Sequence, residues 1–141
     1  MKFWDSSALV PLLVVEASTS QLQAFYDDDE RVLVWWAAVV ECTSALARRE
    51  RAGAPADLIA SGFERLRDLE SRWQETGPAE VVRTTARRLA RVHGLRAADS
   101  FQLAAALVAC EEQPSTLELV TLDDRLALAA SREGFTVVPG P

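Results

Sequence analysis

The chain has 141 residues, of which 49% are hydrophobic and 26% are charged, and its net charge is −6. This length suits one domain with its own core, and we predict a single domain over residues 1–141. No apolar run reaches the roughly 18 residues of a membrane helix, and no signal-peptide cleavage pattern follows the N-terminus. We therefore expect a cytoplasmic protein with no membrane partner, and the acidic balance does not by itself indicate a nucleic-acid binder.

Apolar runs and helical periodicities alternate along the chain between short breaks that contain Gly, Pro or Asp. The predicted strands are 2–5, 31–35, 117–122 and 135–138, and the predicted helices are 7–14, 17–27, 37–52, 55–74, 79–93, 97–111 and 124–133. Strands that are separated by helices pair in parallel and are covered by helices on both faces. The pattern therefore predicts an α/β fold with a mostly parallel central sheet.

Four acidic residues fall where such a fold would gather them. Asp5 ends the first predicted strand and Asp123 follows the third, so in a parallel sheet both lie at the carboxyl edge. Glu41 lies in the first turns of the helix after the second strand, and Asp99 lies near the start of helix 97–111. Each aspartate also has a structural alternative, either as a helix cap or as a first-turn acid that the helix dipole favours.

Glu41 is the hardest of the four to explain as a structural residue. Residues 32–40 before it are all apolar, and Cys42 follows it. A buried carboxylate needs a partner, and the chain offers one Lys and one His besides its arginines. Carboxylates without a His or Cys cluster suit Mg²⁺ or Mn²⁺ and not Zn²⁺. Without a metal, four neighbouring carboxylates would repel one another, and at least one should have a raised pKa.

Four segments of the chain together resemble the PIN-domain ribonucleases, and most closely the VapC-type toxins of bacterial toxin–antitoxin pairs. These segments are DSSAL at 5–9, VVECTSAL at 39–46, LRAADSFQLAAAL at 95–107 and VTLDDRLALAASREGFTVV at 120–138. No single motif is specific, but the ordered set is, and it runs nearly the full length of the chain. The resemblance implies a three-layer α/β/α sandwich and a metal-dependent endoribonuclease.

The resemblance also implies a set of site residues. The acidic quartet of the family maps to Asp5, Glu41, Asp99 and Asp123, which would be both catalytic and metal-binding, with one or two Mg²⁺ or Mn²⁺ ions per site. The T-x-D pattern of the family matches Thr121 to Asp123, which favours Asp123 over Asp124. Ser7 matches a small polar position after the first Asp that often faces the metal, and we expect Ser7 and Thr121 to contact the substrate there.

Fourteen of the fifteen basic residues are Arg, which is suited to bidentate contact with phosphate. Arg87 and Arg91 lie four residues apart on helix 79–93, and three more arginines end the Glu41 helix at positions 48, 49 and 51. These arginines either contact RNA phosphates or form a solvated face. Arg96, three residues before the third acid of the quartet, is the better candidate for touching substrate near the metal.

The resemblance further implies an RNA substrate, a homodimer and a cognate antitoxin whose C-terminal segment fills an apolar groove. We expect the groove walls to include Leu12, Leu13, Leu22, Phe25 and helix 55–74. Two alternatives stay open: a non-catalytic PIN-like protein-binding module, and a PIN nuclease outside a toxin–antitoxin system.

The remaining conspicuous residues are expected to be structural. His93 falls on the apolar face of its helix. Trp35 and Trp36 are expected in the core or at a strand edge, and the other two tryptophans in packing. Cys42 and Cys110 lie in apolar helical segments and are expected to be buried, reduced thiols.

Overall fold

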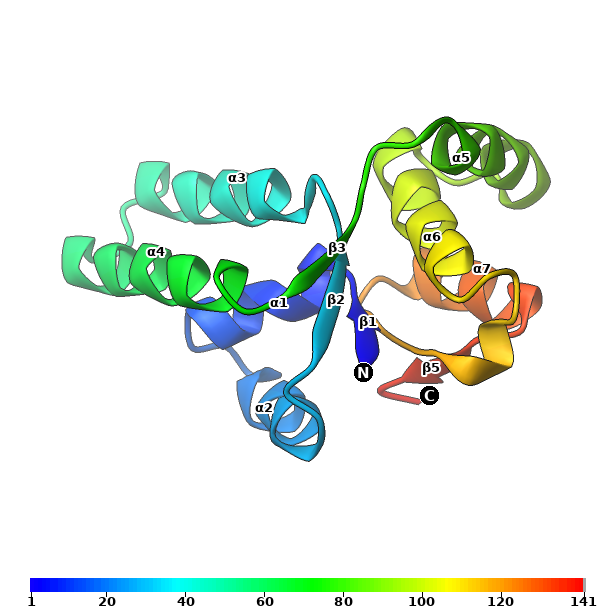
Figure 1. Ribbon diagram of the computed structural model, residues 1–141. Helices are drawn as coiled ribbons and strands as arrows, with labels where there is room; N and C mark the ends of the chain where they lie inside the picture. Colours follow the sequence, from blue (N-terminus) through cyan, green and yellow to red (C-terminus); the bar gives the residue numbers. More distant parts are fainter. Residues whose placement is uncertain (141) are drawn as a thin grey trace.

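A five-stranded, wholly parallel sheet runs through the computed structural model, which describes residues 1–140 (Figure 1). Its strands are β1 (Lys2–Trp4), β2 (Val32–Trp35), β3 (Gln74–Thr76), β4 (Glu118–Val120) and β5 (Thr136–Val138). Their order across the sheet is β3-β2-β1-β4-β5, so the N-terminal strand is central. Its neighbour β2 is wholly buried and apolar, and its neighbour β4 is buried and apolar after Glu118, as expected inside a parallel sheet.

Helices cover both faces of the sheet, which confirms the predicted three-layer α/β/α sandwich. Residues 1–140 contain α1 (Ser6–Leu13), α2 (Thr19–Asp28), α3 (Ala38–Arg51), α4 (Ala56–Glu70), α5 (Glu80–His93), α6 (Ala97–Ala109), α7 (Asp124–Glu133) and a 3₁₀ turn at Pro114–Thr116. Helices α1 to α4 share one apolar core with the sheet, and α5 to α7 share the other. None of these helices has both the length and the apolar character needed to cross a membrane.

The side chains of β2 show how one strand serves both cores. Val32 and Val34 face the core under α1 to α4, whereas Leu33 and Trp35 face the core under α5 to α7. This alternation follows from the two-residue period of a strand. A continuous apolar run is therefore needed wherever both faces of the sheet are covered, which is why VLVW predicts a central strand.

The carboxyl edge of the sheet gathers the starts of several helices. Trp4 pairs with Val120 across β1 and β4, and the next residue, Asp5, donates its backbone N–H to the Val120 carbonyl at 2.9 Å. Asp5 begins α1, and Asp123 begins α7 just beyond β4. The two strand ends thus bring Asp5 and Asp123 to the middle of the same edge.

The prediction of one helix over residues 55–74 is wrong at its C-terminal end. The helix stops at Glu70, and residues 74–76 form β3, an edge strand that pairs in parallel with β2. Trp73, which was assigned to the helix, packs into the core under α1 to α4 from the connecting segment. The sequence Gln-Glu-Thr carries no apolar alternation because an edge strand with exposed side chains does not need one.

The other conspicuous residues behave largely as expected. Trp36 follows β2 and is 52% exposed, whereas the other three tryptophans are buried. Burial raises the pKa of the Cys42 thiol to about 12, so this thiol stays protonated, while Cys110 is only half-buried. His93 makes a structural contact, a 2.6 Å hydrogen bond between its Nε2 and the Glu133 carboxylate.

Candidate active site

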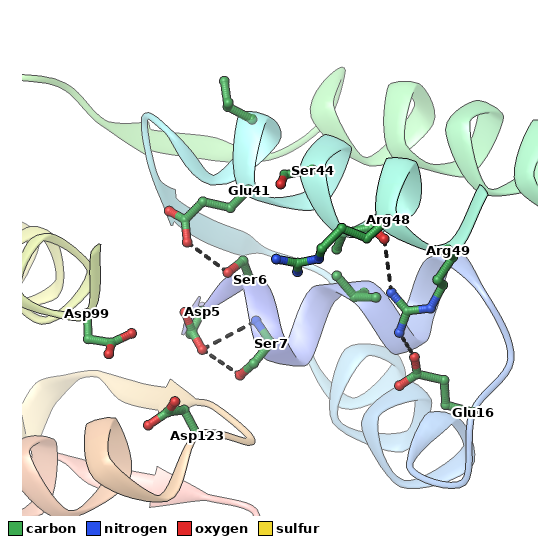
Figure 2. Close-up of a pocket in the computed structure, with 13 residues that line it drawn as sticks. Asp5, Ser6, Ser7, Glu16, Glu41, Ser44, Arg48, Arg49, Asp99 and Asp123 are labelled. Atoms are coloured by element: carbon green, nitrogen blue, oxygen red, sulfur yellow. Dashed lines mark hydrogen bonds and ion pairs between the residues drawn. The ribbon is translucent and has the colours of Figure 1, made fainter. Parts of the chain in front are cut away.

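A hollow of about 580 Å³ opens at the carboxyl edge of the sheet, between α1, α3 and the starts of α6 and α7 (Figure 2). All four predicted carboxylates line it: Asp5, Glu41, Asp99 and Asp123. They come from four separate segments of the chain, so only the fold brings them together. The rest of the lining consists of small side chains from α1 and α3, two arginines and one further acid.

Asp5 is the most constrained of the four acids and is only 4% exposed. Its Oδ2 accepts hydrogen bonds from the hydroxyl and the backbone N–H of Ser7, and from the Thr121 hydroxyl at 2.9 Å. The backbone bond makes Asp5 the N-cap of α1. The structural alternative for Asp5 therefore holds, and it leaves the other carboxylate oxygen free of hydrogen bonds from residues 1–140.

Ser7 and Thr121 connect the two strand ends. The Ser7 hydroxyl accepts the backbone N–H of Leu122 at 2.9 Å, and the Thr121 hydroxyl accepts that of Asp123 at 3.0 Å. The two hydroxyls lie 3.2 Å apart. Because both are occupied by these bonds and by Asp5, their geometry favours a positioning role over the direct substrate contact that the sequence suggested.

Asp123 and Asp124 are adjacent in sequence but lie in different places. Asp123 lines the carboxylate hollow, and its Oδ1 caps α7 by accepting the Leu126 N–H at 2.8 Å. Asp124 is exposed and lines a separate hollow beside Val137 and Pro139. Only the first of the two acids is therefore placed to act with Asp5.

Glu41 projects from the first turn of α3 and is held from two sides. Ser6 donates its hydroxyl to one carboxylate oxygen at 2.9 Å, and Gln102 of α6 donates its amide to the other at 3.0 Å. Gln102 is fully buried, and its own Oε1 has no partner among residues 1–140. The carboxylate thus bridges the two helix layers at the sheet edge.

Asp99 is the least restrained acid of the hollow. It lies in the first turn of α6, is half-buried, and no side-chain hydrogen bond from residues 1–140 holds its carboxylate. Arg96 precedes the same helix, is exposed, and is not part of the lining of the hollow. Its charge lowers the pKa of the Asp99 carboxyl, but this effect is smaller than those of burial and of the neighbouring acids.

Burial is the main reason that the pKa values of Asp5, Glu41 and Asp99 are raised above their ordinary values. Hydrogen bonds oppose this effect at Asp5 and Glu41, and repulsion from neighbouring acids adds to it. A raised pKa was expected from the sequence, but mutual repulsion was the expected cause. In the structure the loss of hydration outweighs repulsion at each of the three acids.

An all-oxygen set of four carboxylates fits a hard divalent cation in its chemistry. Within residues 1–140, no three acidic, histidine or cysteine side chains stand close enough together to form a ready metal cluster.

The arginines divide between two surfaces. Arg48 and Arg49 line the carboxylate hollow. Arg87 and Arg91 lie on α5 in a different hollow of about 500 Å³, which Arg88 also lines. The structure therefore does not bring Arg87 and Arg91 into the carboxylate hollow, and any contact that they make with substrate lies outside it.

Two residues of the site were missed from the sequence. Ser6 stands between two residues that the DSS motif had singled out, and only the position of α3 shows that its hydroxyl meets Glu41. Gln102 follows Asp99 by three residues, which places both on one side of α6. A single Gln inside the apolar run FQLAAAL is the signal that was available.

Comparison with models of known families matches residues 2–131 to the PIN domain. The chain belongs to the PIN-domain family. The matched range includes all four carboxylates of the hollow and both helix layers of the PIN domain.

Two curated relatives match this PIN domain along almost their whole length. They are Ribonuclease VapC45 of Mycobacterium tuberculosis strain CDC 1551 / Oshkosh and Ribonuclease VapC49 of strain H37Rv. Each is 35% identical over 141 residues, which cover 97% of this chain and 94% of the relative.

Solved structures support the same fold. FitAcB from Neisseria gonorrhoeae superposes with a TM-score of 0.67 at 21% identity, covering 97% of this chain and 96% of the other. PAE2754 from Pyrobaculum aerophilum superposes with a TM-score of 0.65 at 22% identity, covering 91% and 78%. At these identities the likeness concerns the arrangement of helices and strands.

Proposed function

We propose that this PIN-domain protein is a VapC-type endoribonuclease, which hydrolyses RNA phosphodiester bonds as the toxin of a toxin–antitoxin pair. One observation carries the proposal: carboxylates from four separate segments meet in one hollow at the carboxyl edge of the sheet. The 35% identity to two ribonucleases, over 97% of the chain, supports the same activity.

The cofactor that we propose is Mg²⁺ or Mn²⁺, as one or two ions. The residues that would hold it, and that we propose as catalytic, are Asp5, Glu41, Asp99 and Asp123. A bound divalent cation neutralises charge on a phosphate and lowers the pKa of water. Burial raises the pKa of three of these acids, and a nearby cation would favour their ionised forms.

The surrounding residues give Asp5 and Glu41 fixed positions before any ligand arrives. Helix capping and the Ser7 and Thr121 hydroxyls hold Asp5, while Ser6 and Gln102 hold the two oxygens of Glu41. Such outer partners orient the groups that meet a metal or substrate. Small side chains line much of the hollow, which leaves room for an extended RNA strand beside the carboxylates.

A second hollow supports the proposed antitoxin partner. It measures about 420 Å³ and lies between α1, α2 and α4, where Leu12, Val15 and Tyr26 line it. Leu13, Leu22 and Phe25 were also expected in its walls, but none of the three lines it, because they pack in or against the core under α1 to α4. An apolar strip of this kind suits an amphipathic partner segment.

The decisive experiment incubates the purified protein with a mixed RNA pool and either Mn²⁺ or EDTA. We expect cleavage with Mn²⁺, none with EDTA, and a loss of more than about 100-fold for Asp5→Asn. Asp124→Asn is the matched control, because this neighbouring acid lies outside the hollow. Cleavage that survives both EDTA and Asp5→Asn would contradict a metal-dependent nuclease, and complete inactivity of the wild type would favour a binding module.

The proposed assembly needs its own measurement. Light scattering of the isolated protein should give the mass of two chains if the expected homodimer forms. A mass of one chain at micromolar concentration would contradict this part of the proposal without affecting the nuclease assignment.

A further inference from the structure

The hollow that holds the carboxylates also has a basic end, formed by two consecutive residues of α3. Arg49 is already engaged, since it donates to the Glu16 carboxylate and to the Ala45 carbonyl. Arg48 is exposed and has no ion-pair partner in the described part of the chain, residues 1–140. Figure 2 shows its guanidinium turned back along the hollow toward Ser6, whereas Arg49 points away to Glu16.

Arg48 lies on the same stripe of α3 as the carboxylate Glu41. Glu41, Ser44 and Arg48 follow one another at spacings of three and four residues, so they share one face of the helix, and all three line the hollow. Seven residues of helix rise by about 10 Å. The opposite wall is α1, which contributes Ser6 and Ser7. A narrow polar track therefore leads from the carboxylates to the free guanidinium.

The charges of the hollow make this guanidinium unusual. Five acids line it: Asp5, Glu16, Glu41, Asp99 and Asp123. Of the two arginines, Arg49 is neutralised by its bond to Glu16, which leaves Arg48 as the one unpaired cation within the described lining. The acids of the hollow repel an RNA strand, except where a cation contacts one of its phosphates. The planar fork of Arg is well matched to the oxygens of a phosphate.

We propose that Arg48 forms a subsite for a second phosphate of the RNA strand, adjacent to the bond that is cleaved. The proposal rests on the ribonuclease function proposed above and adds how the strand is oriented. Two anchoring points, the carboxylate end and Arg48, fix the direction in which the strand runs between α1 and α3. Because the second phosphate does not react, Arg48 binds it equally well before and during the reaction, and this contact affects KM and not kcat.

The first test compares Arg48→Ala with Arg51→Ala on an RNA oligonucleotide that contains the mapped cleavage site. Arg51 is the matched control. Of the three arginines in the last turn of α3, it alone does not line the hollow, and its exposed side chain belongs to the solvated face. We expect Arg48→Ala to raise KM about ten-fold, in line with the loss of a charged hydrogen bond, while kcat stays within about two-fold. Arg51→Ala should leave both constants unchanged.

A second measurement identifies the contact as one with a phosphate. The dependence of log KM on log salt should become shallower by about 0.7 in Arg48→Ala, the value for one phosphate contact to a single strand. Oligonucleotides with one uncharged methylphosphonate linkage then locate that phosphate. One position near the cleaved bond should raise KM about ten-fold in the wild type and have no further effect in Arg48→Ala.

The possible failures are distinguishable. If the wild type cleaves no RNA, the proposed function fails before Arg48 is tested. If the wild type cleaves RNA and Arg48→Ala behaves like Arg51→Ala, the subsite does not exist. An Arg48→Ala variant with an altered Mn²⁺ requirement and an unchanged KM would instead show that Arg48 only balances the carboxylate charges, which also overturns the proposal.

Discussion

Asp5 and Asp99 line the same hollow, yet the fold holds them in opposite ways. Asp5 is buried, caps α1 and accepts three hydrogen bonds, whereas Asp99 is half-buried and accepts none from side chains of residues 1–140. The first acid follows a central strand, so the backbone of the sheet determines where it lies. The second acid stands on the first turn of a helix and can adjust to a ligand. We infer that the site combines a rigid carboxylate with an adaptable one.

The largest expected effect is that of Asp5→Ala. This change removes a carboxylate from the hollow and also leaves the Ser7 N–H and the Thr121 hydroxyl without their acceptor. We expect cleavage to fall more than about 100-fold and the free energy of unfolding to fall by about 1–2 kcal/mol, as for other lost caps. Cleavage assays and thermal melts measure the two losses. Asp5→Asn, which keeps an acceptor, should lose the activity but retain most of the stability.

Asp99→Ala should lose activity to a similar degree without losing stability. No side-chain hydrogen bond depends on this carboxylate, and burial already disfavours its charge, so the melting temperature should stay the same or rise slightly. Asp57→Ala, a first-turn acid of α4 away from the hollow, serves as the control for the helix-dipole contribution. If Asp99→Ala destabilises the protein as much as Asp5→Ala does, the contrast between the two acids is wrong.

Glu41 lies between these extremes, and its pKa gives a pH-dependent prediction. Its carboxyl has a pKa above the ordinary 4.5, chiefly because of burial. A group whose pKa is raised in the folded state binds its proton more tightly there, so its stabilising effect is complete below pH 4.5 and is lost as the pH rises through the raised value. The metal-free wild type should therefore lose stability over this range, and Glu41→Gln should lose less.

Thermal melts in EDTA from pH 4.5 to pH 8 test this prediction. At pH 8 we expect Glu41→Gln to melt a few degrees higher than the wild type, about the effect of 1 kcal/mol in a chain of this size. The gap should close toward pH 4.5. Mn²⁺ should raise the melting temperature of the wild type more than that of Glu41→Gln. A gap that is constant with pH would show that ionisation of Glu41 is not its source.

The layers of the fold could be predicted because burial leaves a pattern in the sequence. The side chains of VLVW pack alternately into the two cores, so all four must be apolar. The acids at positions 5 and 123 follow buried strands, and in a parallel sheet the ends of these strands lie at the same edge. The strand β3 could not be found in this way, because its Gln-Glu-Thr sequence is exposed at the sheet edge. Its place depends on pairing with β2 and not on its own side chains.

The supporting residues of the site show a second limit of sequence patterns. Arg48 and Arg49 are equivalent as neighbours in sequence, and only the approach of Glu16, 33 residues earlier in the chain, binds one and leaves the other free. Gln102 stands out locally only as a single polar residue in an apolar run, and its role depends on the packing of α6 near α3. Such roles depend on contacts between elements that are distant in sequence, and these contacts cannot be predicted from a periodic pattern.

The smallest expected effect is that of Gln102→Leu, which tests whether Glu41 needs its support. The amide of Gln102 donates to Glu41 at 3.0 Å, but its Oε1 is buried without a partner among residues 1–140. Leu fills a similar volume and removes this unsatisfied acceptor, so the melting temperature should stay the same or rise. Cleavage should fall by about 10-fold, as when an outer partner of a site residue is lost.

Ser6→Ala removes the other hydrogen bond to the Glu41 carboxylate and is the companion variant. If the loss of cleavage in the double variant is the product of the two single losses, each hydrogen bond orients Glu41 independently. If either single variant loses as much cleavage as the double variant, the carboxylate is oriented only while both bonds are present. Full activity in the double variant would mean that Glu41, like Asp99, needs no fixed orientation.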